Sequence, residues 1–79
     1  MFLFKVEDRF MVTRIGLVLV PGCGDKKVSI NDKIKIVRPD NSFIETTVMG
    51  TSTNHDISVG NSLTKDDVPV GSEVWLNNE

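Results

Sequence analysis

The chain contains 79 residues, of which 39% are hydrophobic and 25% are charged, a composition typical of one small globular domain rather than a disordered segment. Nine basic against eleven acidic side chains give a net charge of −2, which excludes the overall basic field of a typical free-standing nucleic-acid-binding protein. Valine, isoleucine and threonine supply 23 residues, whereas alanine, the strongest helix former, is absent. This composition predicts an all-β domain.

Short β-rich runs alternate with clusters of glycine, proline, asparagine and aspartate, a spacing typical of a β-sandwich or a β-barrel. No internal repeat, low-complexity tract or linker interrupts them, so we expect a single domain over residues 1–79. The expected strands are residues 3–13, 15–21, 33–38, 43–50, 55–59 and 72–77.

The first four residues are apolar, but Lys5 follows at once, so this run is too short for a signal peptide or for a membrane span of about 20 residues. The lone Cys23 cannot form an intramolecular disulfide, which indicates a reducing compartment. One cysteine and one histidine also cannot supply a metal site of the Cys/His type. We therefore expect a cytoplasmic protein that lacks membrane contact and bound metal.

The run Leu17-Val18-Leu19-Val20 is apolar on both faces of the expected strand. Two explanations remain open, because a domain of this size has little material with which to cover a second face. Either neighbouring loops cover the strand, or it belongs to an exposed patch that meets a protein partner or another copy of the chain. Under the second explanation, Leu17 and Leu19 are the partner-facing residues.

The clearest local unit is a hairpin around residues 39–41. Pairing Ile36 with Ile44 places the isoleucines on one face and sets Lys35 opposite Glu45 on the other, whereas a shift by one residue would place Ile36 against Glu45. We therefore expect a three-residue loop in which Asn41 adopts the left-handed conformation.

The last expected strand follows Pro69 and Gly71, which favour a tight turn at that point. Trp75 lies in this strand, and we expect it to be packed rather than to serve as a stacking platform for a base. The expected core consists of Val6, Phe10, Val12, Val18, Val20, Ile34, Ile36, Ile44, Val48, Val70, Val74 and Leu76.

No pattern of residues assembles into an active site. His55 is the only histidine, and no serine stands in a nucleophile-elbow pattern, so His55 is expected to be a surface residue. Cys23 lies between two glycines without a feature that would lower the pKa of its thiol. A phosphate-cradling loop of the nucleotide-hydrolase type is also absent. We expect no enzyme activity, no cofactor and no nucleotide, with a hydrolase that uses His55 as a minor alternative.

Basic side chains occur in two stretches of the sequence. They are either scattered surface charges or a local patch that faces RNA. Lys26 and Lys27 belong to the second stretch, and the candidate nucleic-acid contacts are Lys5, Arg9, Arg14, Lys33 and Lys35.

Three segments, taken in order, resemble the second domain of translation elongation factor Tu and its relatives. Residues 4–20 (FKVEDRFMVTRIGLVLV) resemble the first strand and hairpin of that domain, and residues 28–37 (VSINDKIKIV) resemble its turn into a Val/Ile strand. Residues 65–74 (KDDVPVGSEV) resemble its closing turn and last strand. In the hairpin, Arg14-Ile15-Gly16 replaces the glycine-arginine-glycine of the family, which displaces the basic residue by one position.

The resemblance implies a single closed antiparallel, Greek-key-like β-barrel of about six strands. It also implies a stand-alone, non-enzymatic binding module, for which the net negative charge and the apolar run 17–20 favour a protein partner or self-association. The alternative is a translation accessory protein that contacts tRNA or ribosomal RNA through the basic residues named above.

Overall fold

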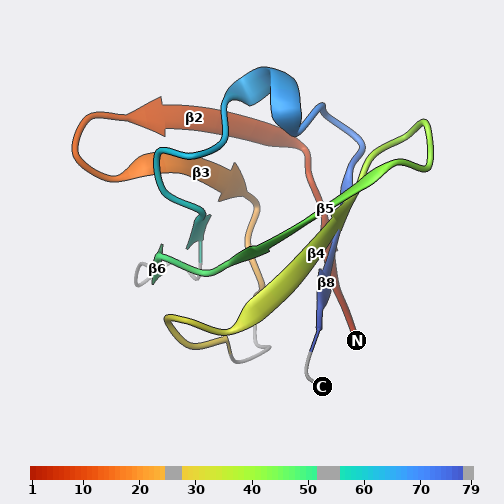
Figure 1. Ribbon diagram of the computed structural model, residues 1–79, viewed down its shortest axis with the longest axis horizontal. Coiled ribbons are helices and arrows are strands. Elements are labelled where there is room, and N and C mark those ends of the chain that lie inside the picture. Colours follow the sequence, from red (N-terminus) through yellow and green to blue (C-terminus); the bar gives the residue numbers. More distant parts are fainter. Residues whose placement is uncertain (25–27, 52–55, 78–79) are drawn as a thin grey trace.

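The computed structural model describes residues 1–24, 28–51 and 56–77, and it confirms the all-β prediction (Figure 1). The only helical element among these residues is a short 3-10 helix, η1, which the sequence analysis did not predict. In chain order the elements are β1 (Phe2–Lys5), β2 (Asp8–Val12), β3 (Gly16–Val20), β4 (Lys33–Val37), β5 (Phe43–Thr47), β6 (Gly50–Thr51), β7 (Ile57–Ser58), η1 (Lys65–Asp67) and β8 (Glu73–Leu76).

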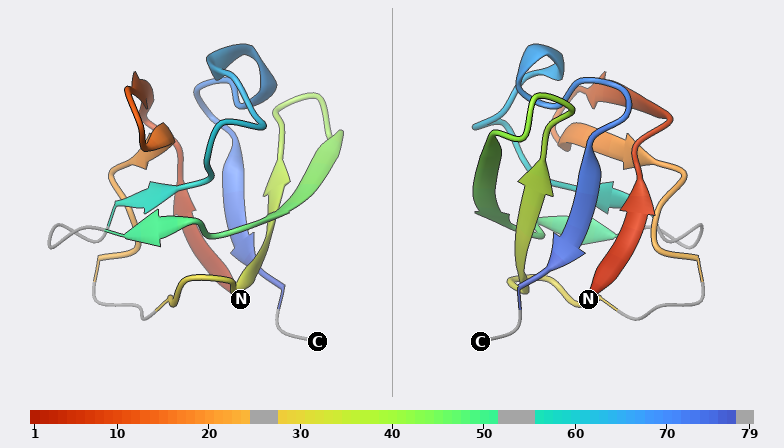
Figure 2. Two further views of the ribbon diagram at one scale, coloured as in Figure 1. Left: turned by 60° about the vertical axis from the view of Figure 1, so that its left-hand side comes forward. Right: turned by 90° about the vertical axis from the view of Figure 1, so that its right-hand side faces the viewer.

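The strands form two separate four-stranded antiparallel sheets, with the orders β1-β8-β4-β5 and β2-β3-β7-β6. The strands of one sheet run across those of the other, as Figure 2 shows. Neither sheet closes on itself, because β1 and β5 remain edges of the first sheet and β2 and β6 remain edges of the second. The prediction of a single closed, Greek-key-like barrel of about six strands is therefore wrong.

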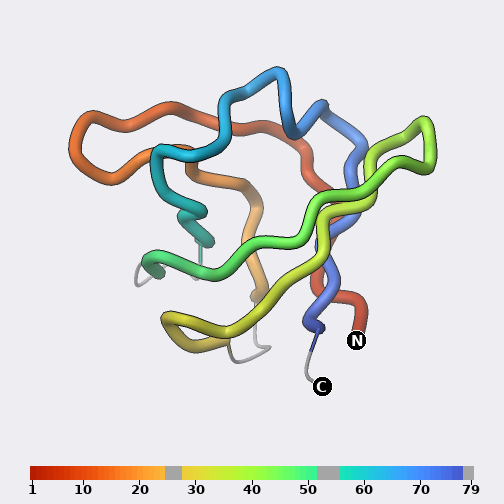
Figure 3. The backbone as a smooth tube through the Cα atoms, in the orientation of Figure 1, coloured from red at the N-terminus to blue at the C-terminus, as the bar shows by residue number. Residues whose placement is uncertain are grey.

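The barrel prediction failed because two of the expected strands each contribute to both sheets. The run 3–13 divides into β1 and β2, and the run 43–50 divides into β5 and β6. Figure 3 follows the chain as it passes from one sheet to the other at these places. Val6 and Val48 lie at the two bends and are only 1% and 0% exposed. Because both valines still point into the core, neither valine by itself marks the bend in the alternation of apolar and polar residues.

The β4–β5 hairpin has the predicted register, with Ile36 opposite Ile44 and Lys35 opposite Glu45. The three-residue loop is confirmed as well, since the amide of Arg38 donates to the carbonyl of Ser42 at 2.7 Å and Asn41 has a φ of 74°. In the same loop, the side chain of Ser42 donates to Asp40 at 2.6 Å. This hydrogen bond, together with that from the Ser42 amide, holds the pKa of Asp40 below its usual value.

The core lies between the two sheets and contains most of the predicted residues of β4 and β8. Ile34, Ile36 and Val74 are fully buried, and Leu76 packs against them from a partly buried position. Three predicted core residues, Phe10, Val12 and Val70, are instead 48%, 37% and 52% exposed. The other buried hydrophobic residues are Leu3, Phe4, Val6, Leu17, Leu19, Cys23, Val48, Ile57, Val59 and Val68.

A close approach of two glycines attaches the β2–β3 hairpin to the end of β7. Gly16 has a φ of 101°, and a Cβ atom added to it would overlap the carbonyl carbon of Gly60. Two hydrogen bonds of 2.9 Å hold this approach, from the Leu17 amide to the Gly60 carbonyl and from the Val59 amide to the Leu17 carbonyl. Position 16 therefore requires glycine both for its backbone conformation and for the space beside it.

We predict that Ile36→Ala lowers the free energy of unfolding by roughly 2–5 kcal/mol, because it empties a fully buried aliphatic position. The matched control is Val70→Ala, which removes an aliphatic side chain that is 52% exposed and should change stability by no more than about 0.5 kcal/mol. Urea denaturation followed by far-UV circular dichroism measures both values. Equal unfolding midpoints for the two variants would contradict the observed packing.

We also predict that Gly16→Ala destabilises the fold by roughly 2–5 kcal/mol, because left-handed strain adds to the displacement of the Gly60 backbone. Gly24→Ala separates these two causes, since Gly24 has a φ of 64° and no atom within 4 Å of an added Cβ. The control should lose only about 1–2 kcal/mol, the contribution of left-handed strain. If thermal melting shows equal losses, the glycine–glycine contact is not a packing constraint.

Candidate functional site

The apolar residues of strand β3 divide between a buried side and an outward side. Leu17 and Leu19 are 0% exposed and belong to the core cluster between the sheets. Val18 and Val20 point the other way and remain partly exposed, because successive side chains of a strand lie on opposite faces. The prediction that Leu17 and Leu19 face a partner is therefore wrong, and the alternate pair of the same strand is the one that solvent reaches.

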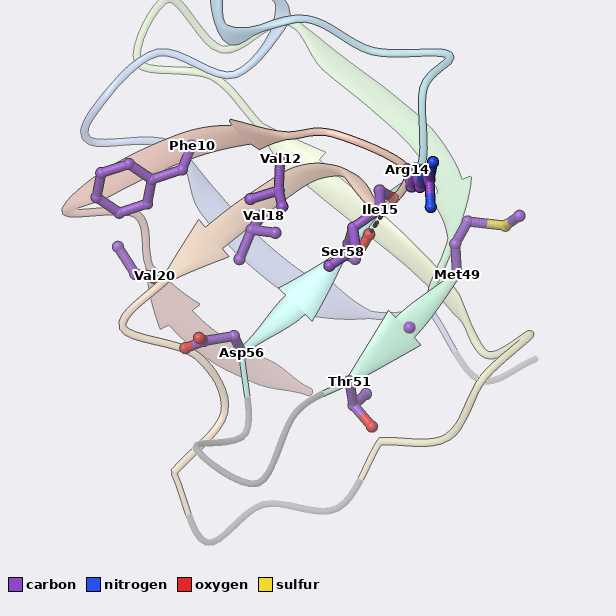
Figure 4. A pocket seen from close by; sticks show the side chains of 11 residues that line it. Phe10, Val12, Arg14, Ile15, Val18, Val20, Met49, Thr51, Asp56 and Ser58 are labelled. Carbon is purple, nitrogen blue, oxygen red and sulfur yellow. Dashed lines mark hydrogen bonds between the residues drawn. The ribbon is translucent and has the colours of Figure 1, made fainter.

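Strand β2 extends this outward surface. Phe10 pairs with Val18, and Val12 pairs with Gly16, so the side chains of Phe10 and Val12 lie on the same side of the sheet as those of Val18 and Val20. Figure 4 shows these four side chains gathered on one side of the two strands. We call this surface, with two further residues at its end, the apolar face: Phe10, Val12, Ile15, Val18, Val20 and Met49.

The two further residues of the apolar face lie outside the strands. Ile15 lies in the β2–β3 turn, where its amide donates to the Val12 carbonyl at 3.1 Å, and it is 52% exposed. Met49 immediately precedes β6 and is 56% exposed. The amide of Met49 donates to the carbonyl of Ser58 at 2.8 Å, which fixes its backbone against β7. Residues from two separate parts of the chain, the β2–β3 hairpin and the segment before β6, thus meet on one surface.

The apolar face is hollowed, and its rim is polar. The hollow has a volume of about 610 Å³, and Arg14, Thr51, Asp56 and Ser58 line it together with the apolar side chains (Figure 4). Ser58 is 5% exposed, and its hydroxyl donates to the Ile15 carbonyl at 3.0 Å. This hydrogen bond stabilises the β2–β3 turn against β7. An apolar centre with a polar rim is the usual anatomy of a protein–protein interface.

Within residues 1–24, 28–51 and 56–77, no group of three or more His, Cys, Asp or Glu side chains is placed to hold a metal ion. Cys23 is 6% exposed and packs in the core. His55, Lys26 and Lys27 lie outside the described residues. In that described portion of the chain, no helix is long and apolar enough to cross a membrane.

The five basic residues proposed as nucleic-acid contacts do not form one patch. Lys5, Lys33 and Lys35 belong to the β1-β8-β4-β5 sheet, whereas Arg9 and Arg14 belong to the β2–β3 hairpin of the other sheet. Arg9 is also engaged within the fold, since its Nε donates to the carbonyl of Lys65 in η1 at 3.4 Å. The lysines and the arginines therefore belong to different sheets.

The sequence analysis assigned most of the apolar face to the core and missed Ile15 and Met49 altogether. One signal was available, because Phe10-Met11-Val12 is a run of three apolar residues in a strand, which an edge strand cannot bury on both faces. In the structure all three are exposed, by 48%, 47% and 37%. Such a run indicates that at least one face of the strand is left exposed to solvent.

Comparisons with known proteins do not assign a function to the apolar face. No protein-family model matches the chain, and searches of curated proteins and of solved structures find no significant match.

Proposed function

We propose that this chain is a non-enzymatic binding module that docks a protein partner on its apolar face. The observation that carries the proposal is the gathering of six apolar side chains on the outer side of one sheet, where three of them are about half exposed. Scattered apolar side chains are common on protein surfaces, but a contiguous hollowed group rimmed by polar residues marks an interaction site.

The composition of the apolar face suits a protein partner. Phe10 and Met49 are of the residue types enriched at interfaces, and both are exposed. Val12, Val18 and Val20 are stiff at χ1, so little side-chain entropy is lost when a partner covers them. The rim carries Arg14 and Asp56, one charge of each sign, which suits a polypeptide of mixed charge better than a polyanion such as RNA.

The relationship to the second domain of translational GTPases is also a proposal. Its support is the order of three sequence segments along the chain. The first segment forms the end of β1 and the β2–β3 hairpin, which carries much of the apolar face. The proposal does not include a closed barrel. A cytoplasmic location belongs to the same proposal, supported by a single cysteine, which is buried in the core.

The test uses an exposed position whose substitution does not disturb the core. Phe10→Asp places a charge in the middle of the apolar face, and we expect it to reduce capture of the partner from a cell extract at least tenfold, as loss of an interface hot spot does. Quantitative mass spectrometry of tagged wild-type and variant protein measures the capture. The matched control is Phe43→Asp, because Phe43 is 52% exposed on the outer side of the other sheet.

The captured protein must then bind the purified chain directly, with the NMR shift changes confined to the apolar face. Sedimentation velocity of the purified chain shows whether a second copy is the occupant, in which case Phe10→Asp should dissociate a dimer while Phe43→Asp leaves it intact. Equal capture by wild type and Phe10→Asp, or equal loss in both variants, would contradict the proposal.

A further inference from the structure

The outer side of the β1-β8-β4-β5 sheet has a different chemistry from the apolar face. Residues that alternate with the buried isoleucines of β4 and with Val74 of β8 point outward from this sheet. They combine exposed rings with lysines on neighbouring strands. We call this surface the aromatic–lysine face, formed by Phe2, Lys5, Lys33, Lys35, Phe43 and Trp75.

The strand register interleaves the rings and the ammonium groups. Trp75 lies between Phe2 on one neighbouring strand and Lys35 on the other. The Phe2 and Trp75 rings meet edge to face with centroids 5.3 Å apart, and the Lys35 ammonium lies 4.3 Å from the centroid of the Phe43 ring. Phe2, Trp75 and Phe43 are 38%, 37% and 52% exposed. Trp75 is packed against Phe2, as expected, but on the outer side of the sheet and not in the core.

The acidic side chains on this side of the sheet are held by neutral donors. The indole Nε1 of Trp75 donates to Glu73 at 3.1 Å, and Nδ2 of Asn77 donates to Glu45 at 2.9 Å. Among the residues that the structure describes, the face thus presents three lysines against two glutamates, whereas the whole chain carries nine basic against eleven acidic side chains. The lysines give this side of a net-acidic chain a local positive excess.

A hollow beside Trp75 supplies a place for a flat group. Its volume is about 490 Å³, and the residues that line it are Lys35, Val37, Glu73, Trp75, Leu76 and Asn77. The lining combines an aromatic wall with an amide, a carboxylate and an ammonium group. These groups match the face of a nucleobase, its donor and acceptor edge and an adjacent phosphate.

We propose that the aromatic–lysine face binds single-stranded nucleic acid, which goes beyond the docking of a protein on the opposite side of the molecule. Bases stack on Trp75 and Phe43, and the ammonium groups of Lys5, Lys33 and Lys35 pair with phosphates along the strand. A protein partner is the less favoured occupant, because lysine is depleted at the core of protein interfaces. A duplex is also disfavoured, because its base faces are already stacked and cannot lie on the exposed rings.

Trp75 is the only tryptophan of the chain, so its fluorescence reports directly on the proposed stacking. We expect quenching when an oligothymidylate or an oligouridylate of about ten nucleotides is added, because stacking and phosphate pairing are common to DNA and RNA. The logarithm of the binding constant should fall with the logarithm of salt concentration with a slope of about −2, the value for three phosphate contacts on a single strand. N-acetyltryptophanamide, titrated in parallel, corrects for absorption by the oligonucleotide.

Variants then locate the site by fluorescence anisotropy of a labelled strand. Trp75→Ala should weaken binding about tenfold or more, the range for loss of one stacked base. Lys35→Glu should weaken it as well and make the salt dependence shallower. The matched control is Phe10→Asp on the apolar face, which should bind like the wild type, and circular dichroism melts confirm that each variant is folded.

Four results would overturn the proposal. The first is unchanged Trp75 fluorescence in the wild-type chain with either oligonucleotide at low salt. The second is binding whose affinity does not depend on salt concentration. The third is an equal loss of affinity in Phe10→Asp and in Trp75→Ala. The fourth is a change of Trp75 fluorescence with protein concentration alone, which would show that a second copy of the chain covers this face.

Discussion

The constraint on which the rest of the structure depends is that, within the described residues, two small sheets bury their apolar side chains mainly against each other. The buried residues of β3 and β7 meet those of β4 and β8, and this contact uses the inner side of both sheets. A domain of this length buries only about 60% of the surface that its unfolded chain exposes. Much of the outer side of each sheet therefore remains exposed to solvent in the described part of the chain.

The parts of the fold that could be predicted from sequence are those in which one face is strongly apolar and the other is charged. In β4, isoleucines alternate with lysines, so only one register with β5 avoids burying a charge, and the structure has that register. The left-handed Asn41 followed from the same reasoning, because a three-residue loop needs such a residue. Local pairing and local turn chemistry were sufficient there.

Which side of the β2–β3 hairpin forms the apolar face could not be predicted, because β2 and β3 carry apolar residues on both sides. In β3, leucines and valines alternate, and hydrophobicity alone does not decide which pair is buried. Which pair is buried is determined by the pairing of β3 with β7 and by the close approach of Gly16 and Gly60, because these contacts orient the hairpin over the core. The bends at Val6 and Val48 escaped prediction for a related reason, because both residues satisfy the alternating pattern while the chain changes sheet. Tertiary contacts between distant segments determine both features.

The placement of the two uncovered faces on opposite sides of one core has a consequence for assembly. The molecule measures only 30 × 28 × 20 Å, so occupants of the two faces would be separated by little more than the thickness of two sheets. Because the faces share no side chain, neither occupant would displace the other. With both faces occupied, the molecule would act as an adaptor. A nucleic acid bound on one face would raise the effective concentration, near that nucleic acid, of a protein bound on the other face.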